Sequence, residues 1–330
     1  MRNPSVDSHQ KAAATGLENA RASFQDARLS RAGALAHGPT TIHIAPFVAV
    51  IALLSTALPA SAQAPWDSIG HLLQSPPAAA AGYTRYNFPR KDITLKVGDV
   101  TVATGLALGT WAGFSGPAGN ATVMGDIVVT ANELKPVLAE LATQGLTVTA
   151  VHNHLAGESP TITYVHFHGR GPALDLAARF DHVIARTGAP RPVTPAAPAP
   201  VTIDTAQVFS VLGARGRAGG AVAQLGLVVV PGAVLLEGDT LVPAMAYGTP
   251  INIQAVTPDR YVATGDFAVL GSREASLTKT LAAHGIIATA VHTHLIGETP
   301  KLSYIHFWAD GRPADVLAGL RAALDSARGP

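Results

Sequence analysis

Two segments of this chain carry nearly the same histidine pattern. Residues 150–169 read "AVHNHLAGESPTITYVHFHG", and residues 290–307 read "AVHTHLIGETPKLSYIHF". When the chain is aligned with itself so that Gly145 to Phe167 match Gly285 to Phe307, 13 of the 23 positions are identical. Self-similarity at a fixed spacing indicates an internal duplication, so both segments are expected to adopt the same local structure.

The residues around each histidine segment predict one order of elements. Short runs rich in β-branched residues, such as "DITLKV" (92–97) and "TVMGDIVV" (122–129), are typical of strands separated by turns. A helical pattern over 131–144 follows, then strands over 146–154 and 161–168, then a helix over 172–186. This order predicts an α+β fold of two homologous domains, each a mainly antiparallel sheet with two helices packed on it.

Proline marks the expected boundary between the two repeats. Five prolines lie between Pro190 and Pro200, and such a stretch is typical of a stiff, extended linker. The predicted organisation is a first repeat over 65–187, a Pro/Ala-rich linker over 188–200 and a second repeat over 201–328.

Residues 1–62 have the features of a leader with a signal peptide. An apolar run over 45–58 has the length of a signal-peptide core, and Ala60, Ser61 and Ala62 form an A-x-A cleavage pattern. The run is shorter than the ~18–20 residues that span a bilayer, so no permanent membrane anchor is expected. We therefore expect a periplasmic or secreted protein; the alternative for the apolar run is a buried N-terminal helix.

Charge and cysteine content exclude several classes of function. The formal net charge is +1, and excluding the predicted leader leaves 18 basic and 19 acidic side chains, which offers no electrostatic surface for nucleic acid. The chain has no cysteine, so disulfides, thiolate nucleophiles and thiolate metal sites are all impossible. Any metal site must use histidines and carboxylates, and the expected partner is a metal or a small molecule.

Strand alternation predicts which side chains share a face. On the strand over 146–154, Leu146, Val148, Ala150, His152 and His154 fall on one face, so the histidines continue an apolar face. On the return strand, Ile162, Tyr164, His166 and His168 share a face. In a hairpin, His152 would lie either directly opposite His166 or two residues out of register, and both arrangements suit two ligands of one ion.

This constellation suggests a metal or small polar ligand in each repeat. Three histidines and one glutamate can hold zinc or another divalent transition metal. The expected ligands are His152, His154 and His166 in the first repeat and His292, His294 and His306 in the second, with Glu158 and Glu298 as ligand or general base. Two alternatives stay open: a metal-dependent hydrolase or lyase, and a structural or interaction module whose histidines only pin the hairpin. The sequence leaves open whether the repeats form one site or two.

Other polar residues are weaker candidates. Asp126 and Asp266 each follow a glycine, which is typical of turns. Ser159 lacks the sequence context of a nucleophilic serine, and no phosphate-binding or dinucleotide-binding glycine motif is present.

Several motifs resemble a known family. The segments "LALGTWAGF", "MGD", "HNHLAGESP" and "VHFHGRG" in the first copy, with "LGARGRAGG", "TGDF", "HTHLIGETP" and "IHFWADG" in the second, resemble the LppY/LpqO family of bacterial exported proteins. The resemblance covers roughly residues 66–326. It implies export but no particular activity. The absence of cysteine departs from the lipoprotein members and argues against lipid anchoring.

Overall fold

The computed structural model describes residues 64–195 and 197–329. The predicted leader and its cleavage pattern lie outside these residues. These described residues belong to one compact unit that contains both repeats. Within the described residues, no helix has the length and apolar character needed to cross a membrane.

The first repeat is built on a six-stranded antiparallel sheet of order β1-β2-β5-β6-β9-β7. Its strands are β1 (Ala78–Ala80), β2 (Tyr83–Pro89), β5 (Gly109–Ser115), β6 (Ala121–Thr130), β7 (Thr147–His152) and β9 (Ile162–Gly171). The helices packed with it are α1 (Ala64–Leu73), α3 (Ala131–Thr143) and α4 (Ala173–Ile184).

The second repeat has the same plan, with a sheet of order β10-β11-β14-β15-β17-β16. Its strands are β10 (Gly216–Gly219), β11 (Val222–Leu227), β14 (Thr249–Thr257), β15 (Arg260–Leu270), β16 (Ile287–His292) and β17 (Leu302–Gly311). Its helices are α5 (Thr205–Leu212), α7 (Glu274–Ala283) and α8 (Pro313–Arg328), with a 3-10 turn, η2 (Gly271–Arg273), before α7.

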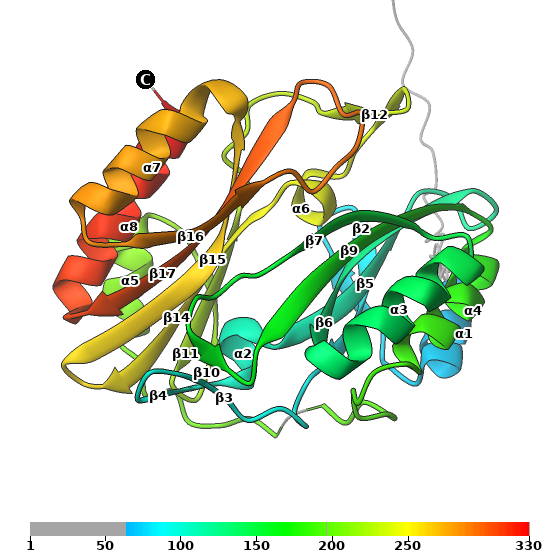
Figure 1. The fold of residues 1–330 in the computed structure, drawn as a ribbon, viewed down its shortest axis with the longest axis horizontal. Coiled ribbons are helices and arrows are strands. Elements are labelled where there is room, and N and C mark those ends of the chain that lie inside the picture. The colour runs from blue at the N-terminus through cyan, green and yellow to red at the C-terminus, as the bar shows by residue number, and fades with distance from the viewer. Residues whose placement is uncertain (1–63, 196, 330) are drawn as a thin grey trace, which may run out of the picture. The chain divides into compact units, whose positions relative to one another are not determined.

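The predicted α+β class is confirmed, and each sheet carries one helix more than expected. α3 and α4, and their counterparts α7 and α8, are the two expected helices of each repeat. The additional helices α1 and α5 contact α4 and α8, respectively. In Figure 1 these six helices lie along the outer sides of their own sheets, and the inner faces of the two sheets are turned towards each other.

A short excursion from each repeat packs against the inner faces of both sheets. The first contains β3 (Leu95–Val97), β4 (Val100–Val102) and α2 (Thr104–Ala107), with β8 (Glu158–Ser159) paired to β3. The second contains β12 (Leu235–Leu236), β13 (Asp239–Thr240) and α6 (Pro243–Ala246). Leu95 and Leu106 of the first belong to a core that includes Trp308 of the second repeat, and the core of the second includes Met124 of the first.

Hydrogen bonds and ion pairs tie each excursion to the other repeat. Asp99, in the turn between β3 and β4, pairs with Arg260 at 2.7 Å, and Asp239, which aligns with Asp99 in the duplication, pairs with Arg170. The side-chain amide of Gln254 donates to the Thr101 carbonyl at 2.9 Å and accepts from the Ala103 N–H at 2.8 Å. The two sheets are therefore held face to face by reciprocal contacts.

A bulge in each histidine strand corrects the predicted faces. β7 pairs Val148 with Phe167 but Ala150 with His166, so the register shifts by one residue at Thr149. Val148 packs on the helix side of the sheet, with Phe167, whereas Ala150 lies opposite His166 on the inner face. The expectation that Leu146 and Val148 share the face of His152 is therefore wrong. β16 has the same shift between Ala288 and Ala290.

Candidate functional site: a histidine centre shared by the two repeats

Six histidines from the two repeats meet between the inner faces of the sheets. His152 and His292 end strands β7 and β16, His166 and His306 lie within β9 and β17, and His154 and His294 follow two residues after β7 and β16. The register pairs His152 with Tyr164, and Ala150 with His166, so His152 and His166 are diagonal neighbours. This is the two-residue slip, one of the two arrangements that the sequence allowed.

The rings are arranged with approximate twofold symmetry. His152 stacks on its counterpart His292 with 3.9 Å between ring centroids. His154 lies 3.8 Å from His306, and His166 lies 3.8 Å from His294. Both of these contacts join residues of different repeats. The structure thus brings the two predicted sets of ligands into one centre.

Three overlapping sets of ligand atoms lie close enough to share an ion. In each set, all ligand atoms lie within 4.8 Å of one another. The sets are His152, His292, His294 and His306; His152, His154 and His166; and His154, Asp266 and His306. The first and third sets contain residues of both repeats, so an ion bound by either set would have ligands from both repeats.

The Nε2 atoms of all six histidines are buried and have no hydrogen-bond partner among the described residues. Buried polar atoms are nearly always paired, so six unpaired imidazole nitrogens in one place need a physical reason. Metal coordination supplies one, because each neutral ring offers its Nε2 lone pair to an ion.

On the other side of several rings, Nδ1 faces an oxygen acceptor. Nδ1 of His152 lies 3.4 Å from the Asn153 carbonyl, and Nδ1 of His292 lies 3.1 Å from the Thr293 carbonyl. Nδ1 of His306 lies 3.4 Å from the Gly265 carbonyl, and Oδ1 of Asp266 lies 2.5 Å from the same nitrogen without hydrogen-bond geometry. An acceptor at Nδ1 favours the tautomer with its proton there and leaves Nε2 free, as in protein metal sites.

Burial favours the neutral form of five of these imidazoles. It lowers the pKa of His154, His166 and His294 well below the usual value, and neighbouring imidazoles lower it further. The same causes lower the pKa of His152, and burial lowers that of His292 to about 4. Neutral imidazole is the form that binds a metal, so at neutral pH these rings are ready to coordinate.

Two aspartates complete the centre, and the sequence interpretation of them was wrong. Asp126 and Asp266 were expected in turns, but they lie within β6 and β15 and are buried. Oδ1 of Asp126 is 3.7 Å from Nε2 of His166. Burial, and then the charge of Asp266, raise the pKa of Asp126 well above its usual value. Their recurrence at aligned positions of the two repeats, like that of the histidines, is the signal that could have identified them.

The glycines before these aspartates have a packing role. A Cβ on Gly125 would overlap the Trp111 carbonyl oxygen, and a Cβ on Gly265 would overlap that of Pro250. Both glycines therefore allow the neighbouring strand to approach closely, and regular alternation along β6 and β15 turns each aspartate to the inner face. The Gly-Asp pair is thus a feature of a strand here and not of a turn.

Two tyrosine rings pack against histidine rings of the centre. Tyr164 lies 3.8 Å from His154, and Tyr304 lies 3.8 Å from His294, between ring centroids. The Tyr164 hydroxyl donates to the Ala107 carbonyl at 2.5 Å, and the Tyr304 hydroxyl donates to the Ala246 carbonyl at 2.9 Å. The last carbonyl of each excursion helix therefore accepts a hydrogen bond from a tyrosine that packs against a histidine of the centre.

Glu158 and Glu298 lie in the segments that follow the two H-x-H motifs. Glu158 is in β8, paired with Val97. The Glu298 carboxylate is buried, accepts from the backbone N–H of Leu302 at 3.2 Å and lies 3.4 Å from Nζ of Lys301. Among the described residues, neither glutamate belongs to the three sets that could share an ion.

Sequence comparison identifies the two repeats as copies of one domain. The model of the family described as Domain of Unknown Function (DUF1259) matches residues 67–186 and again residues 206–326. No curated protein matches the chain.

Among solved structures, a double-ringed trimeric shell protein, MSM0271, from the RMM microcompartment is 9% identical, with 64% of this chain and 84% of that chain covered and a TM-score of 0.17. The regulatory subunit of aspartate kinase from Thermus thermophilus is 12% identical, with 64% and 96% covered and a TM-score of 0.16. TM-scores this low do not indicate a shared fold.

Proposed function

Because the chain belongs to the DUF1259 family of unknown function, through both of its repeats, we propose its function from the site: it binds a divalent transition metal, such as zinc, at the centre shared by the repeats. The observation that carries the proposal is the convergence of six buried Nε2 atoms without hydrogen-bond partners among the described residues. Neutral imidazoles with an acceptor at Nδ1 are the ligands that zinc and related ions take in proteins.

Charge balance supports one ion in each chain. Imidazole ligands coordinate in their neutral form and add no charge, and the two aspartates carry at most −2, which one dication neutralises. Paired metals in proteins usually lie ~3.5–4 Å apart, where their mutual repulsion must be offset by negative ligands. A second dication in this centre would have no further carboxylate to offset its charge. The proposed ligands are His152, His292, His294 and His306, with His154 and His166 beside them and Asp266 close to His306.

The metal content of the purified protein tests this proposal. The parent should retain close to one equivalent of zinc, copper or manganese after incubation with each metal and removal of the excess. Loss of an outer hydrogen-bond partner costs a metal site roughly 10–100-fold in affinity, and His152→Ala should cost more, because it removes a direct ligand. A folded parent that stays metal-free at micromolar concentrations of all three metals would end the proposal.

A cavity beside the histidines favours a second candidate function, a metal-dependent hydrolase or lyase. The cavity has a volume of about 1080 Å³, and His154, His166 and Asp126 line it. In such an enzyme the ion supplies an activated water. Asp126, whose pKa is raised by burial, is the general base that the geometry suggests; Glu158 and Glu298 are those that the sequence motif suggests. Hydrolysis of an activated ester by the zinc-loaded parent, lost in His152→Ala, would support this candidate.

We also propose a location and a finer family assignment. The apolar run over 45–58 and Ala60-Ser61-Ala62 support export to the periplasm or medium. The paired H-x-H-L-x-G-E-x-P segments support the LppY/LpqO group. N-terminal sequencing of exported protein should begin near Gln63, and intact protein confined to the cytoplasm would contradict export.

A further inference from the structure

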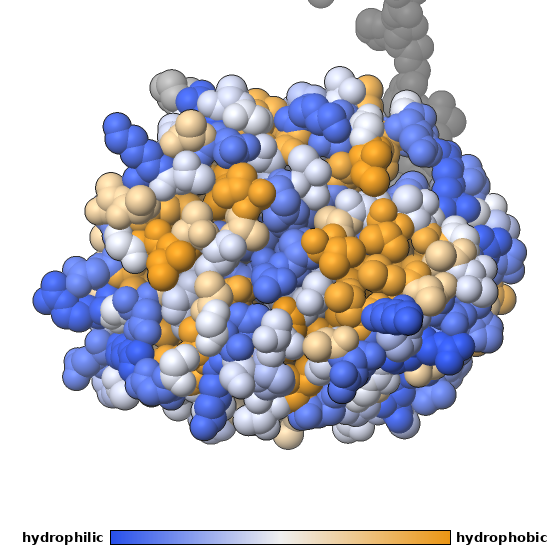
Figure 2. All heavy atoms as spheres, in the orientation of Figure 1, coloured by the Kyte–Doolittle hydropathy of each residue, from blue (hydrophilic) through white to orange (hydrophobic). Residues whose placement is uncertain are grey.

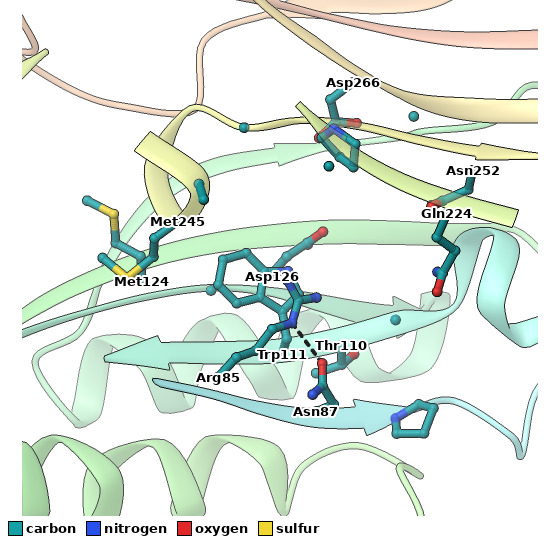
Figure 3. Close-up of a pocket in the computed structure, with 18 of the residues that line it drawn as sticks. Arg85, Asn87, Thr110, Trp111, Met124, Asp126, Gln224, Met245, Asn252 and Asp266 are labelled. Atoms are coloured by element: carbon teal, nitrogen blue, oxygen red, sulfur yellow. Dashed lines mark hydrogen bonds between the residues drawn. The ribbon is translucent and has the colours of Figure 1, made fainter. Parts of the chain in front are cut away.

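One wall of the cavity beside the histidine centre carries an arginine that interacts with Asp126 only from beyond ion-pair distance. Arg85, on β2, donates from Nε to Oδ1 of Asn87 at 2.7 Å. Its guanidinium carbon lies 4.2 Å from the centroid of the Trp111 ring, a cation–π distance. Within the described residues, it forms no ion pair at 4.0 Å or less. Figure 3 shows Arg85 beside Trp111 and Asp126, with its hydrogen bond to Asn87, in the cavity.

The second repeat has a different residue at the corresponding position. Arg85 pairs with Gly113, which pairs with Met124, two residues before Asp126. In the second repeat, Gln224 pairs with Asn252, which pairs with Thr264, two residues before Asp266. Gln224 is therefore the counterpart of Arg85. By the same registers, Pro250 is the counterpart of Trp111, and Gly226 that of Asn87.

Arg85 and its counterpart Gln224 make different contacts. The Gln224 and Asn252 amides donate to the carbonyls of Gly105 and Leu106 in α2, at 2.7 and 2.9 Å, so they dock the excursion of the first repeat. Arg85 makes no such contact with α6, the counterpart of α2; it interacts with Asn87, Trp111 and Tyr83. The duplication has thus diverged at this position and leaves guanidinium N–H donors in the cavity.

We propose that Arg85, Asn87 and Trp111 form the subsite that binds the carboxylate of a small organic acid, whose other end reaches the metal centre. This inference rests on the proposed metal function for the second contact only. The planar guanidinium matches a carboxylate with two parallel hydrogen bonds. Trp111, Met124 and Met245 line the cavity beside it and give an apolar body a surface to pack on.

The surroundings favour a singly charged anion. Asp126 interacts electrostatically with Arg85 and lies on the same wall. A carboxylate carries one charge and is balanced by the Arg85 guanidinium. Arg217, which also lines the cavity, is exposed and donates from Nε to Oε1 of Gln224 at 2.9 Å. A phosphate dianion would meet additional repulsion from the aspartates. The cavity volume of about 1080 Å³ accommodates a ligand of ordinary metabolite size beside the metal.

The test is titration of the zinc-loaded full chain with benzoate, 3-phenylpropionate, benzamide and inorganic phosphate, followed by calorimetry or ligand-observed NMR. At least one of the two carboxylates should bind, and benzamide and phosphate should bind more weakly. Arg85→Gln should weaken carboxylate binding about tenfold or more, because it removes a charged donor. Glutamine is the residue that the second repeat has at this position, so the fold accommodates it.

Arg312→Gln is the matched control, because Arg312 is exposed and pairs with Asp315 away from the cavity. It should bind the carboxylates like the parent. Zinc stoichiometry is measured on every variant. If the parent binds no zinc, the proposed metal function fails, while carboxylate binding that depends on Arg85 would still support the subsite. Equal carboxylate binding by the parent and Arg85→Gln overturns the subsite, as does failure of both carboxylates to bind or phosphate binding as tight as theirs.

Discussion

At the scale of single residues, the two ring nitrogens of His154 and of His306 have different environments. Nδ1 of His306 lies against Asp266, and Nδ1 of His154 lies 3.4 Å from the same Oδ1. The Nε2 atoms of both rings are buried without a partner among the residues that the structure describes. The carboxylate of Asp266 therefore lies beside two rings from different repeats, and the Nε2 atoms of these rings are available to an ion.

Replacing Asp266 by Asn should weaken metal binding roughly 10–100-fold without abolishing it, because the variant removes a charge that lies beside two ligands and leaves the ligands in place. Competition with a chelator of known zinc affinity measures the change. Asp315→Asn, at an exposed position on α8, is the matched control and should bind zinc like the parent. An unchanged affinity in Asp266→Asn would remove this residue from the centre.

The metal-free protein should lose stability as the pH falls from about 7 to 5. Burial lowers the folded-state pKa of five of these histidines, including that of His292 to about 4, whereas the unfolded chain titrates near 6.5. Below pH ~6.5 the unfolded chain therefore binds more protons, and the free energy of unfolding decreases. The raised pKa of Asp126 acts in the opposite sense, but it is one group against five.

Thermal unfolding in chelator at pH 7.5 and 5.5 measures this effect. Replacing His152, His154 and His166 together by Gln should make the dependence on pH weaker than in the parent. A melting temperature that falls equally in both proteins would assign the acid sensitivity to other groups.

At the scale of elements, the two histidine strands depend on a bulge and on a glycine in the neighbouring strand. Because of the bulge at Thr149, Val148 faces the helix side of the sheet, whereas His152 faces the inner side. In a regular strand the two side chains would lie on the same face. Gly125 lets β5 approach β6 closely, one residue before the inward-facing Asp126. Regular strands of the same composition would not place these polar side chains together.

Gly125→Ala should lower the free energy of unfolding by roughly 1–3 kcal/mol or more, because the added methyl group would overlap the Trp111 carbonyl and press on Phe167. Gly119→Ala is the matched control, because a Cβ there meets nothing within 4 Å. Denaturant unfolding of the two variants gives the comparison. If Gly125→Ala is as stable as Gly119→Ala, the close approach of the strands is not what requires glycine.

The sequence predicted the elements around the centre better than the faces of its strands. The α3 helix and the β7–β9 hairpin lie within a few residues of their predicted ranges, because hydrophobic periodicity and glycine stops are local signals. The bulge was missed because a period-2 pattern has no mark for one extra residue, and the slip of a single residue exchanges the two faces. Asp126 was missed because Gly-Asp is also the signature of a turn.

At the scale of the whole molecule, the duplication places half of one site in each repeat. Histidine rings from different repeats lie less than 4 Å apart, between centroids, in three pairs, and each excursion packs against the other repeat. The six histidines were predicted as two equal sets, but contact between the sets depends on long-range packing that no local pattern encodes. In Figure 2 the hydrophobic side chains on this face form separate patches divided by hydrophilic residues.

The count of bound metal in variants of each repeat tests the shared centre most directly. We expect one zinc in each parent chain and the loss of that same ion from both His152→Ala and His292→Ala, although the two residues belong to different repeats. His71→Ala, on α1, is the control and should keep the ion. Two zinc ions in the parent, with one retained by each of the two variants, would show independent sites and contradict a shared centre.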